Sequence, residues 1–128
     1  MRQIKITICA AITLLCISLT IITGCSKTEY VDVDVKPQLE ITVTDVSGKP
    51  VEGATTSLFS SKEDWEKKSN NIQSKKTDAA GKVLFEGLNE TVYYFFVEKN
   101  TLNNFYEIAS IENPLSKNEI KIITCVIR

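Results

Sequence analysis

The chain has 128 residues, with 15 basic side chains, 16 acidic ones and no histidine. A near-neutral chain without a basic stripe has little to neutralise phosphates, which disfavours nucleic-acid binding. The lack of histidine removes the usual general base and the commonest metal ligand, so catalysis and metal binding are disfavoured as well.

The first 24 residues have the three parts of an export signal. Arg2 and Lys5 supply the positive start, and residues 6–22 form an apolar run. The small pair Thr23-Gly24 then precedes Cys25, whose thiol is a site for lipid attachment. A membrane-spanning helix needs about 20 apolar residues, whereas this run is shorter and is interrupted by hydroxyl side chains. The pattern predicts a lipoprotein signal peptide, residues 1–24, cleaved before a lipid-modified Cys25.

Lipidation of Cys25 would hold the protein on a membrane, because each buried CH₂ contributes about 0.8 kcal/mol and several acyl chains act together. Ser26 after the cysteine resembles the outer-membrane sorting pattern of Gram-negative lipoproteins. The expected location is the outer membrane, on its periplasmic or its surface-exposed face. Loss of the two cations in the signal changes the net charge from −1 to −3. With Cys25 acylated, Cys125 has no intramolecular disulfide partner.

Residues 26–37 allow two interpretations. Fully extended at ~3.3 to 3.6 Å per residue, they reach about 40 Å and would lift a domain clear of the lipid headgroups. Val31, Val33 and Val35 alternate with polar residues, however, and could pair as an extra edge strand that Pro37 would interrupt. We favour the tether, since an acidic segment after an acylated cysteine also resembles the surface-export signal of Bacteroidetes lipoproteins. The chain then divides into a signal peptide, the lipidated cysteine with its tether at 25–37, and one folded domain at 38–128.

The folded domain has the sequence pattern of β-strands. Leu39, Ile41 and Val43 alternate with polar residues, as in a strand with one buried face. Further strands are expected at residues 54–60, 82–85 and 91–99. Turns that contain glycine, asparagine or aspartate separate them. We expect neighbouring strands to pair through these tight turns.

Two strands have apolar residues on both faces, which is typical of central or covered strands: residues 92–97 and residues 120–127. The obvious cover is the segment 61–71, which does not follow a strand pattern. Ser61 and Asp64 have the spacing of a helix capping box, so one or two helical turns are expected there. The tryptophan within this segment should pack on the sheet or stay partly exposed, and we favour the covering role.

Four stretches of sequence, in this order, resemble a known domain family. They read LEITVTD at 39–45, GKPVEGA at 48–54, TDAAGKVLFEGL at 77–88 and VYY at 92–94. They are similar to the carboxypeptidase regulatory-like, or transthyretin-like, β-sandwich domain, in particular that of small Bacteroidetes lipoproteins that carry one such domain. The resemblance implies an all-β, immunoglobulin-like or transthyretin-like sandwich of two sheets and about seven strands, with a short helical insertion. Such domains serve as stalks, carriers or ligand-binding modules, so the resemblance specifies a fold rather than an activity.

Each candidate for chemistry has a plainer interpretation. Cys125 lies in an apolar strand without cationic sequence context, as expected of a core residue rather than a nucleophile. Asp45 and Asp78 precede glycines, where such side chains cap turns. The lysine-to-asparagine or lysine-to-aspartate crosslink of the related collagen-adhesin B-type repeats would need an acceptor in the last strand, and residues 120–127 contain neither. We expect no catalytic residues, no metal ligands and no cofactor.

Aromatic side chains are the remaining functional signal. Tyr93, Tyr94, Phe105, Tyr106 and Trp65 could form a surface patch, although aromatic residues in strands are more often core residues. Among them Trp65, Tyr94 and Tyr106 are the candidate contacts for a protein or glycan partner. The expected function is a non-catalytic, lipid-anchored β-sandwich of the cell envelope that binds or supports such a partner. The alternative is a structural or assembly subunit of an outer-membrane complex whose sheet edge accepts another strand. An enzyme is the least favoured class.

Overall fold

The computed structural model describes residues 33–128, which form one compact unit with a hydrophobic core of its own. Cys25, the signal peptide at 1–24 and most of the tether predicted at 25–37 lie outside the described residues. Within 33–128, no helix is long and apolar enough to cross a membrane. Because the described strands and their core belong to one unit, we expect this part of the chain to fold without the residues before it.

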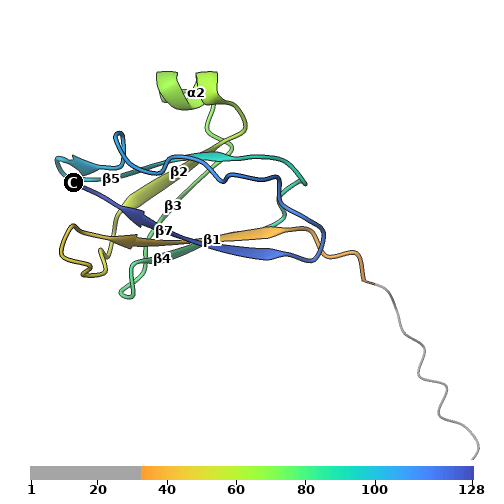
Figure 1. Cartoon of the computed structure of the whole chain (residues 1–128), viewed down its shortest axis with the longest axis horizontal. Helices are drawn as coiled ribbons and strands as arrows, with labels where there is room; N and C mark the ends of the chain where they lie inside the picture. The colour runs from red at the N-terminus through yellow and green to blue at the C-terminus, as the bar shows by residue number, and fades with distance from the viewer. Residues whose placement is uncertain (1–32) are drawn as a thin grey trace, which may run out of the picture. The chain divides into compact units, whose positions relative to one another are not determined.

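This unit is a sandwich of two β-sheets (Figure 1). The first sheet has three strands, in the order β4 (Lys82–Phe85), β1 (Gln38–Thr44) and β7 (Ile120–Val126). The second sheet has four, in the order β3 (Gln73–Lys76), β2 (Thr55–Phe59), β5 (Tyr94–Lys99) and β6 (Leu102–Asn103). One short helix, α2 (Lys62–Lys67), connects β2 to β3 and contacts β2 and β5. The predicted fold class, an all-β sandwich of about seven strands with a short helical insertion, is confirmed.

Strand β1 lies at the centre of the first sheet and pairs on both sides. It runs antiparallel to β4, with Ile41 opposite Val83, and parallel to β7, with Ile41 opposite Ile123. Its Leu39, Ile41 and Val43 are fully buried, and the residues between them are half-buried. The predicted alternation is therefore confirmed. It also fixes the register, because a slip by one residue would bring the apolar side chains to the outer face.

The inner faces of the two sheets meet in one apolar core. Phe85 of β4, Phe95 of β5 and Leu58 of β2 are fully buried and belong to the same cluster of core side chains. Burial of such a side chain contributes about 1.5 to 3 kcal/mol. Within residues 33–128 the only cysteine, Cys125, is buried and free, so apolar burial rather than a disulfide stabilises this unit.

The prediction that neighbouring strands pair through tight turns is wrong for most of the chain. Among the described strands, only β2 with β3, and β5 with β6, are both consecutive in the chain and hydrogen-bonded to one another. The turns after β1 and after β4 lead to the other sheet instead. Turn residues determine where the chain reverses, but the choice of sheet depends on burial. A chain that crosses between the sheets lets the apolar faces of both meet.

The two strands predicted to be central or covered differ in the structure. Strand β5 is central, with Phe95 and Val97 buried and the outward Phe96 half-buried, so this prediction is confirmed. For β7 the prediction is wrong, because this strand is at the edge of its sheet and pairs only with β1. Its outward Ile120 and Ile122 are 59% and 64% exposed. The helix cannot cover them, since it belongs to the connection between two strands of the other sheet.

Residues 33–37, the described part of the segment 26–37, form no strand. The backbone of Val35 instead makes two hydrogen bonds with Asn118: its N–H donates to Oδ1 at 2.9 Å, and its carbonyl accepts from the Asn118 N–H at 3.0 Å. Lys117 and Asp34 form an ion pair at 3.2 Å beside them. These contacts hold residues 34–35 against the loop before β7, so a free tether would have to lie before them.

Candidate functional site

Helix α2 forms because both of its ends are capped. The Ser61 hydroxyl accepts from the backbone N–H of Asp64 at 3.2 Å and donates to the Asp64 carboxylate at 2.8 Å. Ser61 is therefore the predicted N-cap, but the Asp64 carboxylate accepts from the Ser61 hydroxyl and not from its backbone N–H, so only half of a capping box forms. At the other end Lys68 takes a left-handed conformation with φ of 52°, and its N–H donates to the Trp65 carbonyl at 3.2 Å. This cap brings the side chains of Trp65 and Lys68 together beside the second sheet.

Four rings from three parts of the chain gather near this helix, and we call Trp65, Phe96, Phe105 and Tyr106 the aromatic cluster. Trp65 and Phe105 are stacked, with ring centroids 5.7 Å apart and 13° between the ring planes. Phe105 and Tyr106 meet edge to face, with centroids 5.0 Å apart. Phe96 joins through Lys68, whose ammonium lies over the rings of Phe96, Trp65 and Phe105. Phe105 and Tyr106 are exposed, so the cluster presents ring surface to solvent.

Trp65 fixes the cluster to the sheet. Its indole N–H donates to the Phe95 carbonyl at 2.9 Å, and the side chain is half-buried. A buried indole usually satisfies its N–H in this way. Trp65 therefore packs on the sheet, as we favoured, and keeps part of its surface open.

The loop after β6 carries two rings of the cluster and is held by Asn104, which the sequence analysis did not single out. Asn104 is fully buried. Its Oδ1 accepts from the Val97 N–H at 2.9 Å, and its Nδ2 donates to the carbonyls of Ile108 at 2.9 Å and Phe95 at 3.3 Å. A buried amide with these hydrogen bonds ties the loop to β5. Asparagine after a short strand is a turn signal, but no sequence pattern shows that this one is buried.

Lys68 is a second residue that the sequence analysis missed. Its ammonium lies 3.8 Å from the ring centroid of Phe96, 4.7 Å from that of Trp65 and 4.9 Å from that of Phe105. These distances lie within the range of about 6 Å for a cation–π interaction. Burial beside the rings lowers the pKa of Lys68, and the charge of Glu98 opposes that shift. Phe96 and Phe105 lie 28 and 37 residues after Lys68 in the sequence, so only folding reveals the arrangement.

The structure brings two of the three predicted contact residues into the cluster. Trp65 and Tyr106 both make ring contacts with Phe105. Tyr94 is half-buried on β5 and takes part in none of the ring pairs among the described residues. Tyr93 is buried and belongs to the core. The surface patch therefore consists of the helix and the loop after β6, with Phe96 of β5 behind them.

The candidates for chemistry occupy structural positions. Burial raises the pKa of the Cys125 thiol to about 12, so it stays protonated and unreactive at neutral pH. Asp45 Oδ1 accepts from the N–H and the hydroxyl of Ser47, and this hydroxyl contributes most to lowering the pKa of Asp45. Asp78 Oδ1 accepts from the Lys82 N–H at 2.9 Å, so both aspartates cap turns, as predicted. The described residues contain no group of three or more His, Cys, Asp or Glu side chains that could hold a metal ion.

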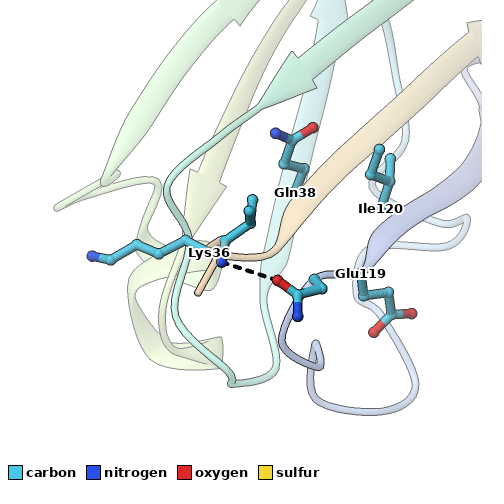
Figure 2. Close-up of a pocket in the computed structure, with 6 residues that line it drawn as sticks. Lys36, Gln38, Glu119 and Ile120 are labelled. Carbon is cyan, nitrogen blue, oxygen red and sulfur yellow. Dashed lines mark hydrogen bonds between the residues drawn. The ribbon is translucent and has the colours of Figure 1, made fainter. Parts of the chain in front are cut away.

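A hollow of about 310 Å³ lies where β1 and β7 begin (Figure 2). It is lined by Val35, Lys36, Gln38, Asn118, Glu119 and Ile120. This lining contains one carboxylate and no hydroxyl or thiol that could act as a nucleophile. Figure 2 shows the side chains of Lys36 and Glu119 pointing away from one another, so they do not converge on a ligand. The aromatic cluster is therefore the stronger candidate for a binding site.

The chain belongs to the SpaA prealbumin-like fold domain family, whose model matches residues 37–124. The predicted transthyretin-like sandwich is thereby confirmed at the level of the fold, and domains of this fold are typically non-catalytic structural modules. No curated protein matches the chain. Among solved structures, it is similar to the Bacillus anthracis TIE protein, with 18% identity over 73% of this chain and a TM-score of 0.50. It spans only 16% of that protein, so the likeness concerns the fold alone. Catechol 1,2-dioxygenase from Pseudomonas arvilla C-1 matches with 12% identity over 77% of this chain and 54% of that one, at a TM-score of 0.40.

Proposed function

We propose that the protein is a lipid-anchored, non-catalytic module of the outer membrane that binds a protein or glycan partner through the aromatic cluster. The observation that carries this proposal is the ring surface of Phe105 and Tyr106, which are 45% and 88% exposed beside the half-buried Trp65. Exposed rings at the edge of a packed site gain free energy when a partner covers them. Membership of a typically non-catalytic fold family supports a binding or supporting role.

The N-terminal sequence supports the anchor. An apolar run and a small pair of residues precede Cys25, and the resemblance to small Bacteroidetes lipoproteins supports the outer membrane as the location. Only residues 26–32 separate Cys25 from the first described residue, Val33. Fully extended, this stretch of chain reaches roughly 28 Å. A lipid on Cys25 would therefore keep the sandwich close to the headgroups.

The anchor is tested by Cys25→Ala. This change should abolish incorporation of radiolabelled palmitate and leave an uncleaved or mislocalised precursor, because acyl attachment and lipoprotein cleavage both depend on that thiol. Cys125→Ala is the matched control, since this buried thiol should take no lipid and its replacement should leave incorporation unchanged. Normal labelling of the Cys25 variant would contradict the proposed anchor.

The partner site is tested by protein crosslinking in intact cells and by a glycan screen with residues 26–128. Tyr106→Ala should weaken capture of the partner and leave the melting temperature nearly unchanged, because Tyr106 is 88% exposed. Val46→Ala removes an exposed apolar side chain from the turn after β1, outside both proposed contact surfaces, and serves as the control. Equal capture by the Tyr106 variant and the unaltered protein would contradict a role for the aromatic cluster.

A second candidate function, that of an assembly subunit, has an observation of its own. Within residues 33–128, strand β7 pairs only with β1. The bonds from Gln38 N–H to the Glu119 carbonyl and from Ile127 N–H to the Thr44 carbonyl show that odd-numbered positions of β7 face β1, so the N–H groups at even-numbered positions point away from it. The outward Ile122 lies on this open edge. A strand from another subunit could therefore pair with β7. Ile122→Pro would remove one outward N–H donor from this edge and leave the hydrogen bonds to β1 in place. If this variant and Tyr106→Ala each weaken capture of the partner, the protein has two separate contact surfaces.

A further inference from the structure

Lys68 differs from the other lysines of its helix in what surrounds its charge. Lys62 and Lys67 each form an ion pair with a glutamate one turn away. Lys68 has no carboxylate within ion-pairing distance among the described residues. Its ammonium donates one long hydrogen bond, of 3.4 Å, to the Trp65 carbonyl. An ammonium has three donors, so Lys68 keeps donors for another acceptor.

The rings around Lys68 hold this ammonium at the surface and leave it accessible. Lys68 is an exposed residue, and its nitrogen lies over Phe96, Trp65 and Phe105 at 3.8 to 4.9 Å from the ring centroids. The left-handed cap at Lys68 fixes where the side chain starts, and the three rings fix where it ends. A cation held in this way attracts an anion without first having to be ordered.

The surface next to this cation is aromatic. Phe105 and Tyr106 are exposed. The Phe105 ring lies 4.9 Å from the Lys68 ammonium, stacks on Trp65 and meets Tyr106 edge to face. Exposed aromatic rings stack against the apolar face of a sugar ring, and a positive charge at their edge can pair with an acidic group on the same sugar. Lys68 would repel a cationic ligand, and a neutral ligand would not pair with the Lys68 ammonium.

We propose that the aromatic cluster binds an acidic sugar, a pyranose that carries a carboxylate, with the carboxylate paired with the Lys68 ammonium. Phe105 and Tyr106 lie at 85° to one another, so the sugar ring stacks on the more exposed Tyr106 and meets Phe105 with its edge. The inference rests on the proposed function and narrows the partner to one class of glycan. An acidic protein is disfavoured as the ligand, because the chain without its signal peptide has a net charge of −3 and would repel a large polyanion. A sugar with a single carboxylate needs only one cation, which Lys68 supplies.

Binding is measured with residues 26–128 through the fluorescence of Trp65, the only tryptophan. The probes are oligosaccharides that end in uronic or sialic acids, each also prepared as its methyl ester, which keeps the sugar ring and removes the charge. The acids should bind more tightly than their esters by roughly 1.5- to 5-fold, the range for an exposed ion pair. Their binding should weaken as the salt concentration rises, whereas binding of the esters should not.

Three variants separate the role of Lys68 from a general effect of charge. Lys68→Met removes the ammonium, keeps an unbranched side chain that is one atom shorter, and should remove the preference for the acid over its ester. Lys68→Arg should restore that preference. Lys67 is paired with Glu63 on the same helix. Lys67→Met also removes one positive charge, but it should keep the preference for the acid over its ester.

Equal binding of acids and esters, or equal loss in the Lys68→Met and Lys67→Met variants, would overturn the inference. Failure of every acidic probe to bind would overturn it as well. Each of these results would contradict the acidic-sugar ligand without contradicting the aromatic cluster as a binding site. If Tyr106→Ala still weakens capture of a protein partner in cells, the aromatic cluster is a binding site and only the ligand class is wrong.

Discussion

Gly81→Ala should destabilise the domain more than Gly48→Ala, although both glycines have positive φ values, +73° and +84°. A Cβ on Gly81 would lie 2.5 Å from the carbonyl oxygen of Val43 and 3.0 Å from the backbone nitrogen of Val51. A Cβ on Gly48 would meet nothing within 4 Å. Both substitutions therefore place a residue with a Cβ in a left-handed conformation. Only Gly81→Ala also brings the new Cβ too close to neighbouring backbone atoms.

The magnitudes follow from these contacts. A left-handed conformation costs a residue with a Cβ about 1 to 2 kcal/mol, and both variants incur this cost. At Gly81 the backbone must also move away from Val43, whose N–H donates to the Gly81 carbonyl at 2.7 Å. Val43 is fully buried, and a buried hydrogen-bonding group left without its bond costs about 1 to 3 kcal/mol. We expect losses of about 2 to 5 kcal/mol for Gly81→Ala and about 1 to 2 kcal/mol for Gly48→Ala.

Urea denaturation of residues 26–128, followed by circular dichroism, measures both free energies of unfolding. The slopes against urea should agree between the variants, so that the difference reflects stability rather than compactness. In thermal unfolding, each 1 kcal/mol corresponds to a shift in Tm of about 4 to 8 °C for a domain of this size. Equal losses at Gly81 and Gly48 would refute the reasoning, because the close approach at Gly81 would then carry no energetic cost.

Phe85→Ala should lower the free energy of unfolding by about 3 to 5 kcal/mol, because Phe85 is fully buried opposite Leu39, and an unchanged Tm would contradict this burial. Asn104→Ala should cost about 1 to 3 kcal/mol, because it leaves the Val97 N–H without its acceptor. It should also make Trp65 easier to quench with iodide, since the stacked Phe105 lies in the released loop, and unaltered quenching would show that Asn104 does not position this ring. Cys125 should resist alkylation in the folded protein up to about pH 10 and react after unfolding, because burial raises its pKa to about 12. Folding stability should then fall as the pH rises above 9, where the unfolded thiol loses its proton and the folded one keeps it, and alkylation of the folded protein with a midpoint near pH 9 would contradict this.

The parts of the fold that the sequence predicts are those set by neighbours along the chain. The alternation around Ile41 and the helix N-cap at Ser61 depend on residues a few positions apart, and both are confirmed. The position of β7 at a sheet edge depends on which strand lies beside it. An apolar outer face such as that of Ile122 therefore does not distinguish a covered strand from an exposed one.

The same distinction holds for the candidate site. Trp65 stands out in the sequence because it is the only tryptophan and lies in a segment without a strand pattern. Lys68 is one of several lysines in that region, and its special position depends on Phe96 and Phe105, which folding brings to it. Asn104 is ordinary in sequence and fully buried in the structure. Residue type identifies candidates, whereas long-range packing decides which of them form a site.

The parallel pairing of β1 with β7 has a mechanical consequence. The two strands are in register from Gln38 with Ile120 to Thr44 with Val126. Because they run in the same direction, a pull on the N-terminal end of β1 against the C-terminal end of β7 loads all of these backbone hydrogen bonds at once, in shear, instead of breaking them one after another. Force applied between these two ends would therefore meet the resistance of the whole β1–β7 ladder before the two strands could separate.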